Sequence, residues 1–450
     1  MASLLGKQAI VIGAGIGGLA AAAAVSDYFE NVIVLERDDL PDGATPRAGT
    51  PQSRHTHVLL GGGERALESL FPGFTAALTQ AGAVPYRMGL DILAEMAGFD
   101  PFPHRDLGWF GYAMTRPLIE RTVRQELRKR PNVKLRDGCR VAQLVAGERH
   151  GGTVSAVRLA GANGADEVLP ADLVVDASGR AAFTLDALRA CNYPLPSETT
   201  IGIDMNYATC IFAIPDDAPP HWKGVFTFSA PPAIKRGAIM FPIEGKRWIL
   251  SLGGAHGDAP PGDLDGFLAY AKELRTQTVY RAIKDATPDG DVMRFAFPES
   301  IWRHFERLES FPRGLLPFGD SICRFNPIYG QGMSVAAKEA CVLRDLLTAR
   351  AAAGDALDGL APAFFAGIQE VLDTPWAAAA ISDFAYPETR GERPPDLQAT
   401  FGFGRAILRL AARDADVHKL RMEVMNLLKP RSVYRDPALV ERVRAIMAEA

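Results

Sequence analysis

Short apolar runs separated by glycine-rich turns predict that the chain begins with a strand, a helix and a second strand. Gln8–Ile12 and Asn31–Glu36 are apolar runs of β type, and the alanine-rich stretch Leu19–Val25 between them favours a helix. This order is the βαβ unit of a parallel sheet. The hydrophobic pattern is then lost from Pro41 to Gly63, where we expect a long loop.

The middle of the chain alternates between helical and β patterns. The amphipathic segment Thr115–Arg130 predicts a helix with a proline near its start, where proline is tolerated. Alternating strands around "GERHGG", residues 147–152, predict a hairpin, and Ala171–Arg180 predicts a buried strand that ends at glycine. Aromatic and β-branched runs from Thr199 to Gly254 predict a sheet in a separate layer. From Met333 onward, beginning with a helix to about Leu347, the pattern is mostly helical.

These patterns predict an α/β protein with a parallel-sheet domain, a mixed β-sheet domain and a helical C-terminal region. A chain of 450 residues is too long for one simple core. We expect the parallel-sheet domain to comprise residues 1–84, 110–185 and 300–350, the mixed-sheet domain residues 85–109 and 186–299, and the helical region residues 351–450.

Composition narrows the classes of function. The net charge of −4 lacks the basic excess that is typical of nucleic-acid-binding proteins. The five cysteines have no paired spacing, which argues against a disulfide framework or a zinc site and favours a reducing cytoplasm. The chain starts almost at once with a strand instead of an export signal, and it has no apolar run of about 18 residues, so we expect no transmembrane helix.

The turn after the first strand carries a dinucleotide-binding pattern, "GAGIGG". Gly13 permits a tight turn, Gly15 lets the backbone approach a pyrophosphate, and Gly18 lets the helix pack on the strand. The free N–H groups at the start of the helix would bind the phosphates. Glu36 ends the second strand, near the position expected for an acid that binds a ribose.

A second stretch, "GDSICRFNPIYGQGMSVAAKEA" from Gly319, places proline and glycines before a helix, which indicates a backbone that approaches another molecule. Together with Gly13–Gly18 it resembles the FAD-dependent monooxygenases related to p-hydroxybenzoate hydroxylase. The resemblance implies that the parallel-sheet domain is a Rossmann-like FAD-binding domain of GR2 type, into which the mixed β-sheet domain is inserted to bind substrate. The resemblance implies that Asp320 holds the ribitol chain of FAD. It also implies that the backbone of Pro327 and "GQG" lies against the flavin ring, with the helix N-terminus at the pyrimidine edge. Such an N-terminus stabilises the negative charge of reduced flavin.

The same resemblance assigns further residues to the FAD site. Arg116 matches an arginine that lies against the cofactor, and "DASGR" from Asp176 replaces a motif that serves both FAD and nicotinamide in relatives. We therefore expect Asp176 and Gly179 to keep an FAD-facing role, without support for nicotinamide binding, and Val141 to lie on the adenine side. The segment of Gln52, Arg54 and His55 is expected beside the flavin, with one of the three in contact with FAD, although a purely structural loop fits the sequence equally well. The cofactor-binding set is Gly13, Gly15, Gly18, Glu36, Arg37, Arg54, Arg116, Val141, Asp176, Gly319, Asp320, Pro327, Gly330, Gly332 and Met333.

Within this superfamily, residues 50–74 and 314–337 resemble the bacterial polyether-type epoxidases, which are similar to squalene epoxidase. The resemblance implies that reduced flavin takes up molecular oxygen at C4a and that the hydroperoxide epoxidises or hydroxylates a substrate. NADPH or NADH would supply the electrons, directly or through a separate flavin reductase. The apolar middle of the chain and the electrophilic oxidant together predict a lipophilic, electron-rich alkene or aromatic of secondary metabolism. Apolar helical faces in the C-terminal tail could touch a membrane surface.

No side chain is assigned a catalytic role, because the flavin would carry the chemistry. His55 and His57 form an H-x-H pair, but no third ligand stands nearby, so we predict no metal site. Four residues are candidates for the substrate pocket, although each fits the core of the sheet at least as well: Tyr207, Phe228, Met240 and Trp248.

Three other functions remain open. An FAD-dependent reductase of an isoprenoid double bond, similar to the geranylgeranyl reductases, would share both flavin motifs. A flavin-dependent halogenase would carry a Trp-x-Trp-x-Ile-Pro signature, and this chain has only "GWFGYAM" and "KRWILSL". A flavoprotein that senses a ligand without catalysis is the third alternative.

Overall fold

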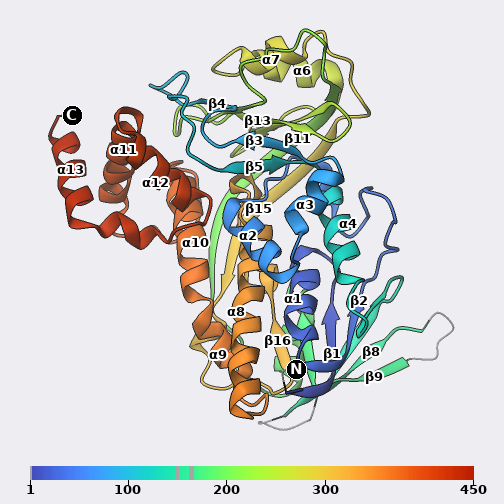
Figure 1. Cartoon of the computed structure of the whole chain (residues 1–450). Helices are drawn as coiled ribbons and strands as arrows, with labels where there is room; N and C mark the ends of the chain where they lie inside the picture. Colours follow the sequence, from blue (N-terminus) through green and yellow to red (C-terminus); the bar gives the residue numbers. More distant parts are fainter. Residues whose placement is uncertain (1–2, 147–151, 162–166, 450) are drawn as a thin grey trace.

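A five-stranded parallel sheet forms the base of the cofactor domain in the computed structural model, which describes residues 3–146, 152–161 and 167–449 (Figure 1). In spatial order its strands are β16 (Leu315–Pro317), β10 (Leu173–Asp176), β1 (Gly6–Ile12), β2 (Phe29–Leu35) and β6 (Val133–Arg136). The predicted βαβ unit is confirmed, with α1 (Ile16–Ser26) between β1 and β2. Because every pair is parallel, the carboxyl ends of all five strands lie along one edge.

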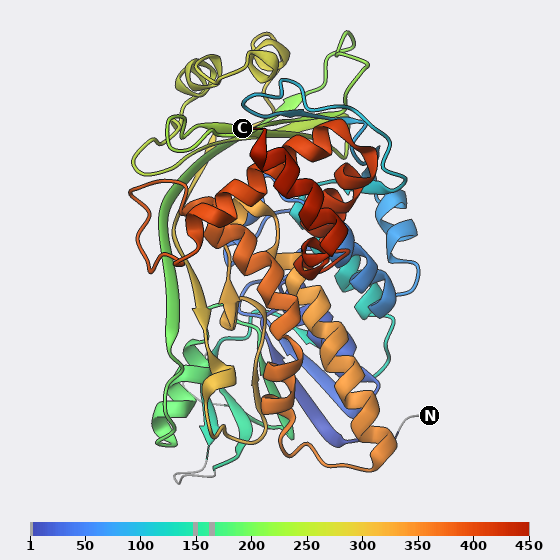
Figure 2. The same cartoon turned by 90° about the vertical axis from the view of Figure 1, so that its left-hand side faces the viewer.

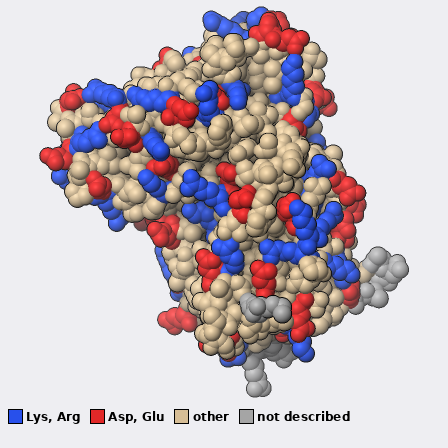
Figure 3. All heavy atoms as spheres, viewed as in Figure 1, with Lys and Arg blue, Asp and Glu red and all other residues tan. Residues whose placement is uncertain are grey.

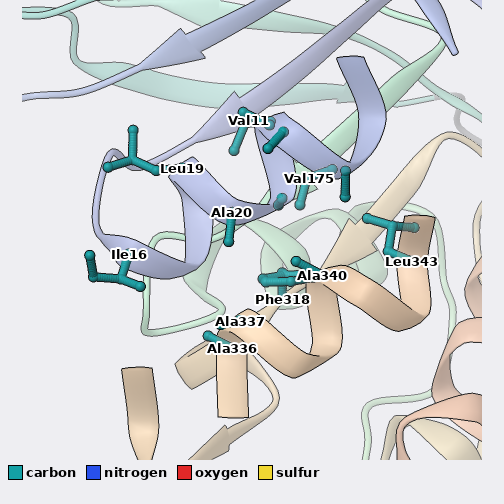
Figure 4. Close-up of a cluster of buried hydrophobic side chains, with 14 of the residues drawn as sticks. Val11, Ile16, Leu19, Ala20, Val175, Phe318, Ala336, Ala337, Ala340 and Leu343 are labelled. Carbon is teal, nitrogen blue, oxygen red and sulfur yellow. The ribbon is translucent and has the colours of Figure 1, made fainter. Parts of the chain in front are cut away.

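Two helices, α1 and α8 (Gly332–Ala353), pack against each other on one face of this sheet. Figure 4 shows their contact, in which small side chains such as Ala20, Ala336 and Ala340 lie between the helices, with Val11 and Val175 from the sheet nearby. Small residues allow a close approach, and even a Cβ added at Gly17 would lie 3.4 Å from the Cβ of Ala336. The two helices that start with glycine motifs are therefore held firmly relative to one another.

The separate β layer predicted around Thr199–Gly254 is a seven-stranded mixed sheet. In spatial order it contains β17 (Cys323–Arg324), β15 (Met293–Arg303), β11 (Glu198–Ala213), β14 (Arg247–Gly254), β13 (Gly237–Ile243), β12 (Gly224–Thr227) and β4 (Ile92–Glu95). All pairs are antiparallel except β12 with β4. The predicted domain boundary at residue 300 falls inside β15, because its pairing with β11 continues to Arg303. Helices α6 (Leu264–Lys272) and α7 (Thr278–Ile283) cover the outer face.

Smaller elements complete the two layers. The predicted hairpin is confirmed as β7 (Val141–Ala146) and β8 (Val154–Leu159), and β9 (Glu167–Pro170) extends it, whereas its turn at residues 147–151 lies outside the described residues. The loop from Pro41 is also confirmed as far as Leu60, apart from the short 3-10 helix η1 (Pro51–Arg54), but its predicted end at Gly63 falls inside the first turn of a helix that starts at Gly61. The other elements are β3 (Val84–Arg87), β5 (Phe110–Ala113), α2 (Gly61–Leu70), α3 (Phe74–Gln80), α4 (Arg116–Leu127) and α5 (Ala182–Ala190).

The C-terminal region is helical, as predicted, and contains α9 (Leu360–Gly367), α10 (Gln369–Asp383), α11 (Leu397–Arg413), α12 (Ala415–Met425) and α13 (Pro437–Ala448). Figure 2 shows α10 beside α8, with α11, α12 and α13 gathered around a core of their own. Acidic and basic side chains are intermixed on the face in Figure 3. Across the described ranges, no helix combines the length and the apolar character needed to cross a membrane.

Candidate cofactor site

The predicted cofactor motifs converge on the carboxyl edge of the five-stranded sheet. Gly13 follows β1, Glu36 follows β2, Asp176 ends β10 and Gly319 follows β16 after one residue. Ligands of open α/β sheets bind at this edge, where the loops after the strands come together. The fold thus assembles into one site motifs that are far apart in the sequence.

The three fingerprint glycines have distinct structural reasons. Gly13 has φ +102°, and a Cβ there would lie 2.7 Å from the carbonyl oxygen of Ala177. A Cβ on Gly18 would lie only 1.9 Å from the carbonyl oxygen of Gly13, so the contact between helix and turn requires glycine. A Cβ on Gly15 would meet no atom within 4 Å. Gly15 therefore borders open space at the uncapped start of α1, where the predicted pyrophosphate would lie.

Glu36 is buried beside the fingerprint, and its carboxylate is already engaged. One oxygen accepts the N–H of Ala14 at 2.8 Å and pairs with Nη1 of Arg47 at 2.9 Å, and the other accepts the N–H of Arg37 at 2.9 Å. A ribose at Glu36 would have to share these oxygens. The Arg37 side chain is 68% exposed and lies 3.8 Å from Asp38, so it contributes little to the buried site.

Arg47 was not among the residues expected from the sequence. Its guanidinium is buried among Glu36, Asp38 (3.1 Å) and Glu120 (3.3 Å). Burial alone would lower the pKa of Arg47, but Glu120 and Glu36 raise it above its ordinary value. Arg47 therefore stays charged and ties the loop before η1 to both β2 and α4.

Arg116, the first residue of α4, continues this network toward the second motif. Its Nε donates to Glu120 at 2.9 Å, and Nη1 lies 3.5 Å from Nε2 of His57. Nδ1 of His57 lies 2.9 Å from the carbonyl oxygen of His55 and must carry the hydrogen, because a carbonyl only accepts. Burial, with the nearby Arg116 charge, lowers the pKa of His57 to about 3, so the neutral ring presents a lone pair to Arg116.

Asp320 lies in the 3-10 turn Gly319–Ser321, and its carboxylate forms no hydrogen bond or ion pair with any residue that the structure describes. Burial raises the pKa of Asp320, and the charges of Arg116 and Arg324 partly offset that rise. A Cβ added at Gly332 would lie 3.6 Å from Oδ1 of Asp320. A Cβ added at Gly179 would lie 3.8 Å from the Cβ of Asp320. Asp320 and these glycines border one open space, which fits a ligand rich in hydroxyl groups.

The start of α8 faces the same region. Gly330 has φ +65°, and the main-chain N–H groups of Gly332 and Met333 have no partner among the described residues. Gln331 caps nothing with its side chain, and its Oε1 is buried without a partner. Unpaired donors at a helix N-terminus favour a negatively charged or carbonyl-rich ligand.

Asp383, at the end of α10, holds the loop that leads to α8. It lies in no sequence motif, so the sequence analysis did not identify it. Its carboxylate accepts Nδ2 of Asn326 at 3.1 Å and the hydroxyl of Tyr329 at 2.7 Å. Asn326 in turn accepts the N–H of Ile328 at 3.3 Å. Burial raises the pKa of Asp383 to about 6, and these two donors limit the rise. The segment that contains Pro327 is thus clamped from the C-terminal region.

For three of the predicted FAD-binding residues, the structure gives no side chain that is free to bind the cofactor inside the site. Both oxygens of Asp176 are used within the chain, one by Ser178 (N–H 3.2 Å, hydroxyl 2.6 Å) and one by Thr184 (N–H 3.1 Å, hydroxyl 2.7 Å). Asp176 therefore shapes the loop beside the site, and a direct contact with FAD stays a prediction. Val141 is buried with the ends of β1 and β2, whereas the Arg54 side chain is exposed at the end of η1.

Comparisons with known proteins agree with this geometry. Protein Rv3254 of Mycobacterium tuberculosis (strain ATCC 25618 / H37Rv) is 33% identical over 403 residues, which cover 86% of this chain and 82% of the relative. Residues 8–216 match the family described as FAD dependent oxidoreductase. The chain belongs to the FAD-dependent oxidoreductase family. The cofactor of this family fits the site, because Gly15, Gly332 and Asp320 offer open backbone and an unpartnered acceptor.

Solved structures support the flavoprotein fold. The p-nitrophenol 4-monooxygenase PnpA from Pseudomonas putida DLL-E4 has a TM-score of 0.65 at 17% identity, covering 96% of this chain and all of PnpA. The flavin-dependent brominase Bmp2 has a TM-score of 0.66 at 15% identity, covering 98% of this chain and all of Bmp2. At such identities the likeness shows the fold alone. The predicted α/β fold, with a Rossmann-like FAD-binding domain and a helical C-terminal region, is confirmed.

In this oxidoreductase the four pocket candidates lie on different faces of the seven-stranded sheet. Tyr207 faces the cofactor side, with its hydroxyl 3.4 Å from Oδ1 of Asn326. Phe228 follows β12 and stacks on Phe226. Met240 and Trp248 instead point into the core beneath α6 and α7, which corrects their assignment to the pocket. Neighbouring residues of a strand point to opposite faces, and these two lie in register with residues of the outer core.

Proposed function

We propose that this FAD-dependent oxidoreductase is a monooxygenase that epoxidises or hydroxylates a lipophilic, electron-rich alkene or aromatic. The observation that carries the proposal is the uncapped start of α8 beside the unpartnered Asp320. When bound, FAD supplies the chemistry that activates molecular oxygen. The fold of PnpA, a monooxygenase by name, adds support.

The residues of this chain would bind and orient the cofactor. Asp320 would accept hydroxyls of the ribitol chain, and the N–H groups at the start of α1 would bind the pyrophosphate. The N–H groups of Gly332 and Met333 would face the edge of the flavin ring where the reduced form carries negative charge. Asp383, through Asn326, would keep the Pro327 backbone in place against that ring.

The substrate class follows from the side chains on the cofactor-facing side of the seven-stranded sheet. Its buried clusters there are aromatic and aliphatic, and they include Tyr207, Phe241 and Ile249 with Phe226 and Phe295 packed against them. Removing apolar surface from water contributes about 25 cal/mol per Å². Side chains of this kind beside the cofactor would favour a lipophilic molecule over a small multiply charged metabolite. We propose an intermediate of secondary metabolism, as in the polyether-type epoxidases that the sequence resembles.

The electron source is NADPH or NADH, and we infer that direct reduction is slow without substrate. The inference rests on Ala177 and Ser178, which interrupt the motif that serves nicotinamide in relatives. Rapid mixing of the holoenzyme with NADPH should bleach the flavin slowly unless a flavin reductase is added. Fast bleaching by NADPH alone, independent of substrate, would contradict this. We place the protein and its reductase in the cytoplasm.

The test of the oxygenation reaction uses labelled molecular oxygen. The holoenzyme, NADPH and a flavin reductase are given a panel of lipophilic alkenes and phenols, with small polar acids as controls and with or without bromide. We expect one labelled oxygen atom in a lipophilic product. Label in the polar acids alone would overturn the substrate class, and a brominated product would favour a halogenase like Bmp2. A substrate that loses a double bond without taking up label would favour the reductase.

A further inference from the structure

His55 is a buried imidazole on the cofactor-facing side of the seven-stranded sheet. It follows η1, is 6% exposed, and lies with its ring centroid 5.6 Å from that of Phe295 and 6.1 Å from that of Tyr207. Ile328, from the loop that Asp383 clamps, packs on the same aromatic cluster. His55 therefore stands between the sheet and the loop expected to lie on the flavin.

A chain of hydrogen bonds fixes which nitrogen of His55 carries the proton. The hydroxyl of Ser251 donates to Oγ1 of Thr56 at 2.9 Å and so has no second hydrogen to give. The hydroxyl of Thr209, 2.6 Å from Oγ of Ser251, must then donate to Ser251. Because the hydrogen of Thr209 is used in this way, Oγ1 of Thr209 can only accept from the imidazole, and Nδ1 of His55 donates to it at 2.7 Å. The network thus assigns the hydrogen to Nδ1.

The opposite nitrogen, Nε2, is then a bare acceptor. Burial, together with the charge of Arg54, lowers the pKa of His55 to about 4, so the ring is neutral at pH 7 and has one N–H. Nε2 has no hydrogen-bond partner among the residues described here, and it is accessible to solvent. An accessible acceptor among aromatic rings is free to take a hydrogen bond from a donor group of a ligand.

We propose that Nε2 of His55 recognises the substrate by accepting a hydrogen bond from a hydroxyl or N–H group on an otherwise apolar aromatic or alkene. The inference rests on the proposed function, whose substrate class it narrows. A methyl ether of the same shape has no hydrogen to donate, and a carboxylate would be repelled by the lone pair. Thr209 and Ser251 are positioning residues, because they hold the proton on Nδ1.

The recognition involves no net proton transfer. A phenol has a pKa of about 10, far above that of His55, so the proton stays on the substrate oxygen in the complex. The hydrogen bond nevertheless moves electron density into the ring. That shift favours attack by an electrophilic oxygen.

The test compares two probes of matched shape, 2-naphthol and 2-methoxynaphthalene, on the holoenzyme. Their dissociation constants are measured from quenching of probe fluorescence. Wild type should bind naphthol about 3- to 10-fold more tightly than the ether, as expected for one neutral hydrogen bond. His55→Phe keeps the aromatic packing and should remove the preference. His55→Gln should restore part of it, and Thr209→Val should weaken it by freeing the imidazole to exchange its proton between the two nitrogens.

His418→Phe is the matched control, because His418 is also buried and packs edge-on against Phe102 in the separate C-terminal core. It should keep the preference for naphthol. Nitrogen-15 spectra of histidine-labelled protein at pH 7 should show the hydrogen of His55 on Nδ1, and a hydrogen on Nε2 would overturn the proposal. Equal affinities in wild type, no binding of either probe, or a preference that survives in His55→Phe would also overturn it.

Further outcomes distinguish substrate recognition by His55 from a contact between His55 and the flavin, and from the proposed function itself. If Nε2 accepts from the flavin instead, His55→Phe will change the flavin spectrum and shift both probes equally, which refutes substrate recognition. A naphthol preference that depends on His55, in an enzyme that inserts no labelled oxygen, supports this site and refutes the proposed function. Oxygen insertion into ethers as readily as into phenols would support the proposed function and refute recognition of the substrate by His55.

Discussion

Replacing Asp320 with asparagine should change FAD affinity and apoprotein stability in opposite directions. The carboxylate of Asp320 has no hydrogen-bond or ion-pair partner among the described residues, and it borders the open space next to Gly332. Without cofactor it is a partly buried charge that none of these residues pairs with. With FAD bound, it would accept hydroxyls of the ribitol chain. Such a residue would stabilise the complex at the expense of the free protein.

The magnitude follows from the kind of contact. A hydrogen bond to a charged group contributes about 1.5–3 kcal/mol, and 1.4 kcal/mol corresponds to a tenfold change in affinity. Asp320→Asn should therefore weaken FAD binding about 10- to 150-fold. The pKa of Asp320 is raised in the folded protein, so the native state holds this proton more tightly than the unfolded chain. The carboxyl thus destabilises the apoprotein at neutral pH, and this penalty disappears below the unfolded pKa of about 3.9.

Titration calorimetry of FAD into apoprotein and thermal unfolding of apoprotein at pH 7 measure the two effects. Asp320→Asn should bind FAD more weakly while its apoprotein unfolds at a higher temperature than wild type. The advantage in unfolding temperature should shrink as the pH approaches 4. Asp217→Asn, at an exposed position, should change neither property. Unchanged FAD affinity, or an apoprotein that is less stable than wild type, would refute the reasoning.

Two other substitutions test the geometry around the cofactor. Gly18→Ala places a methyl group 1.9 Å from the carbonyl oxygen of Gly13, so both FAD binding and apoprotein stability should fall. We expect the loss of stability to be about 1–3 kcal/mol or more. The methyl group of Gly15→Ala meets open space, so this variant should mainly weaken FAD binding. Equal stability losses at the two positions, measured by urea unfolding, would contradict this contrast. The pKa of Asp383, about 6, lies above its unfolded value, so wild-type stability should fall as the pH rises from about 4 to 6, by up to roughly 3 kcal/mol. Asp383→Asn should flatten that part of the pH profile, and an unaltered profile would exclude Asp383 as its source.

The cofactor half could be predicted because its signals are local. A tight turn, a close backbone approach and a helix start each need particular residues at fixed spacing, and Gly13–Gly18 and Gly319–Gly332 carry them within short stretches. Arg47 and Asp383 carry no such signal. Arg47 meets Glu120 across 73 positions and Asp383 meets Asn326 across 57, so only the folded chain identifies their partners.

The substrate side shows a different limit. Alternation along β13 and β14 predicts two faces, but it does not indicate which face is turned toward the cofactor. For that reason Met240 and Trp248 could not be separated from Tyr207 before the outer helices α6 and α7 were placed. His55 was expected near the flavin by resemblance alone. Its tautomer depends on Thr209 and Ser251, which lie more than 150 positions away.

The N-terminal ends of four helices link the C-terminal region to the candidate cofactor site. The first N–H groups of α2 are satisfied by Asn426, whose carbonyl oxygen accepts from Gly62 at 2.8 Å, and α4 is capped by Thr115. Helices α1 and α8 lie beside them without a side-chain cap. Free N–H groups at a helix start require another partner, such as water or a ligand. The chain thus uses its tail to cap α2 and to clamp the loop before α8, while it leaves open the two helix starts that face Asp320 and Gly15.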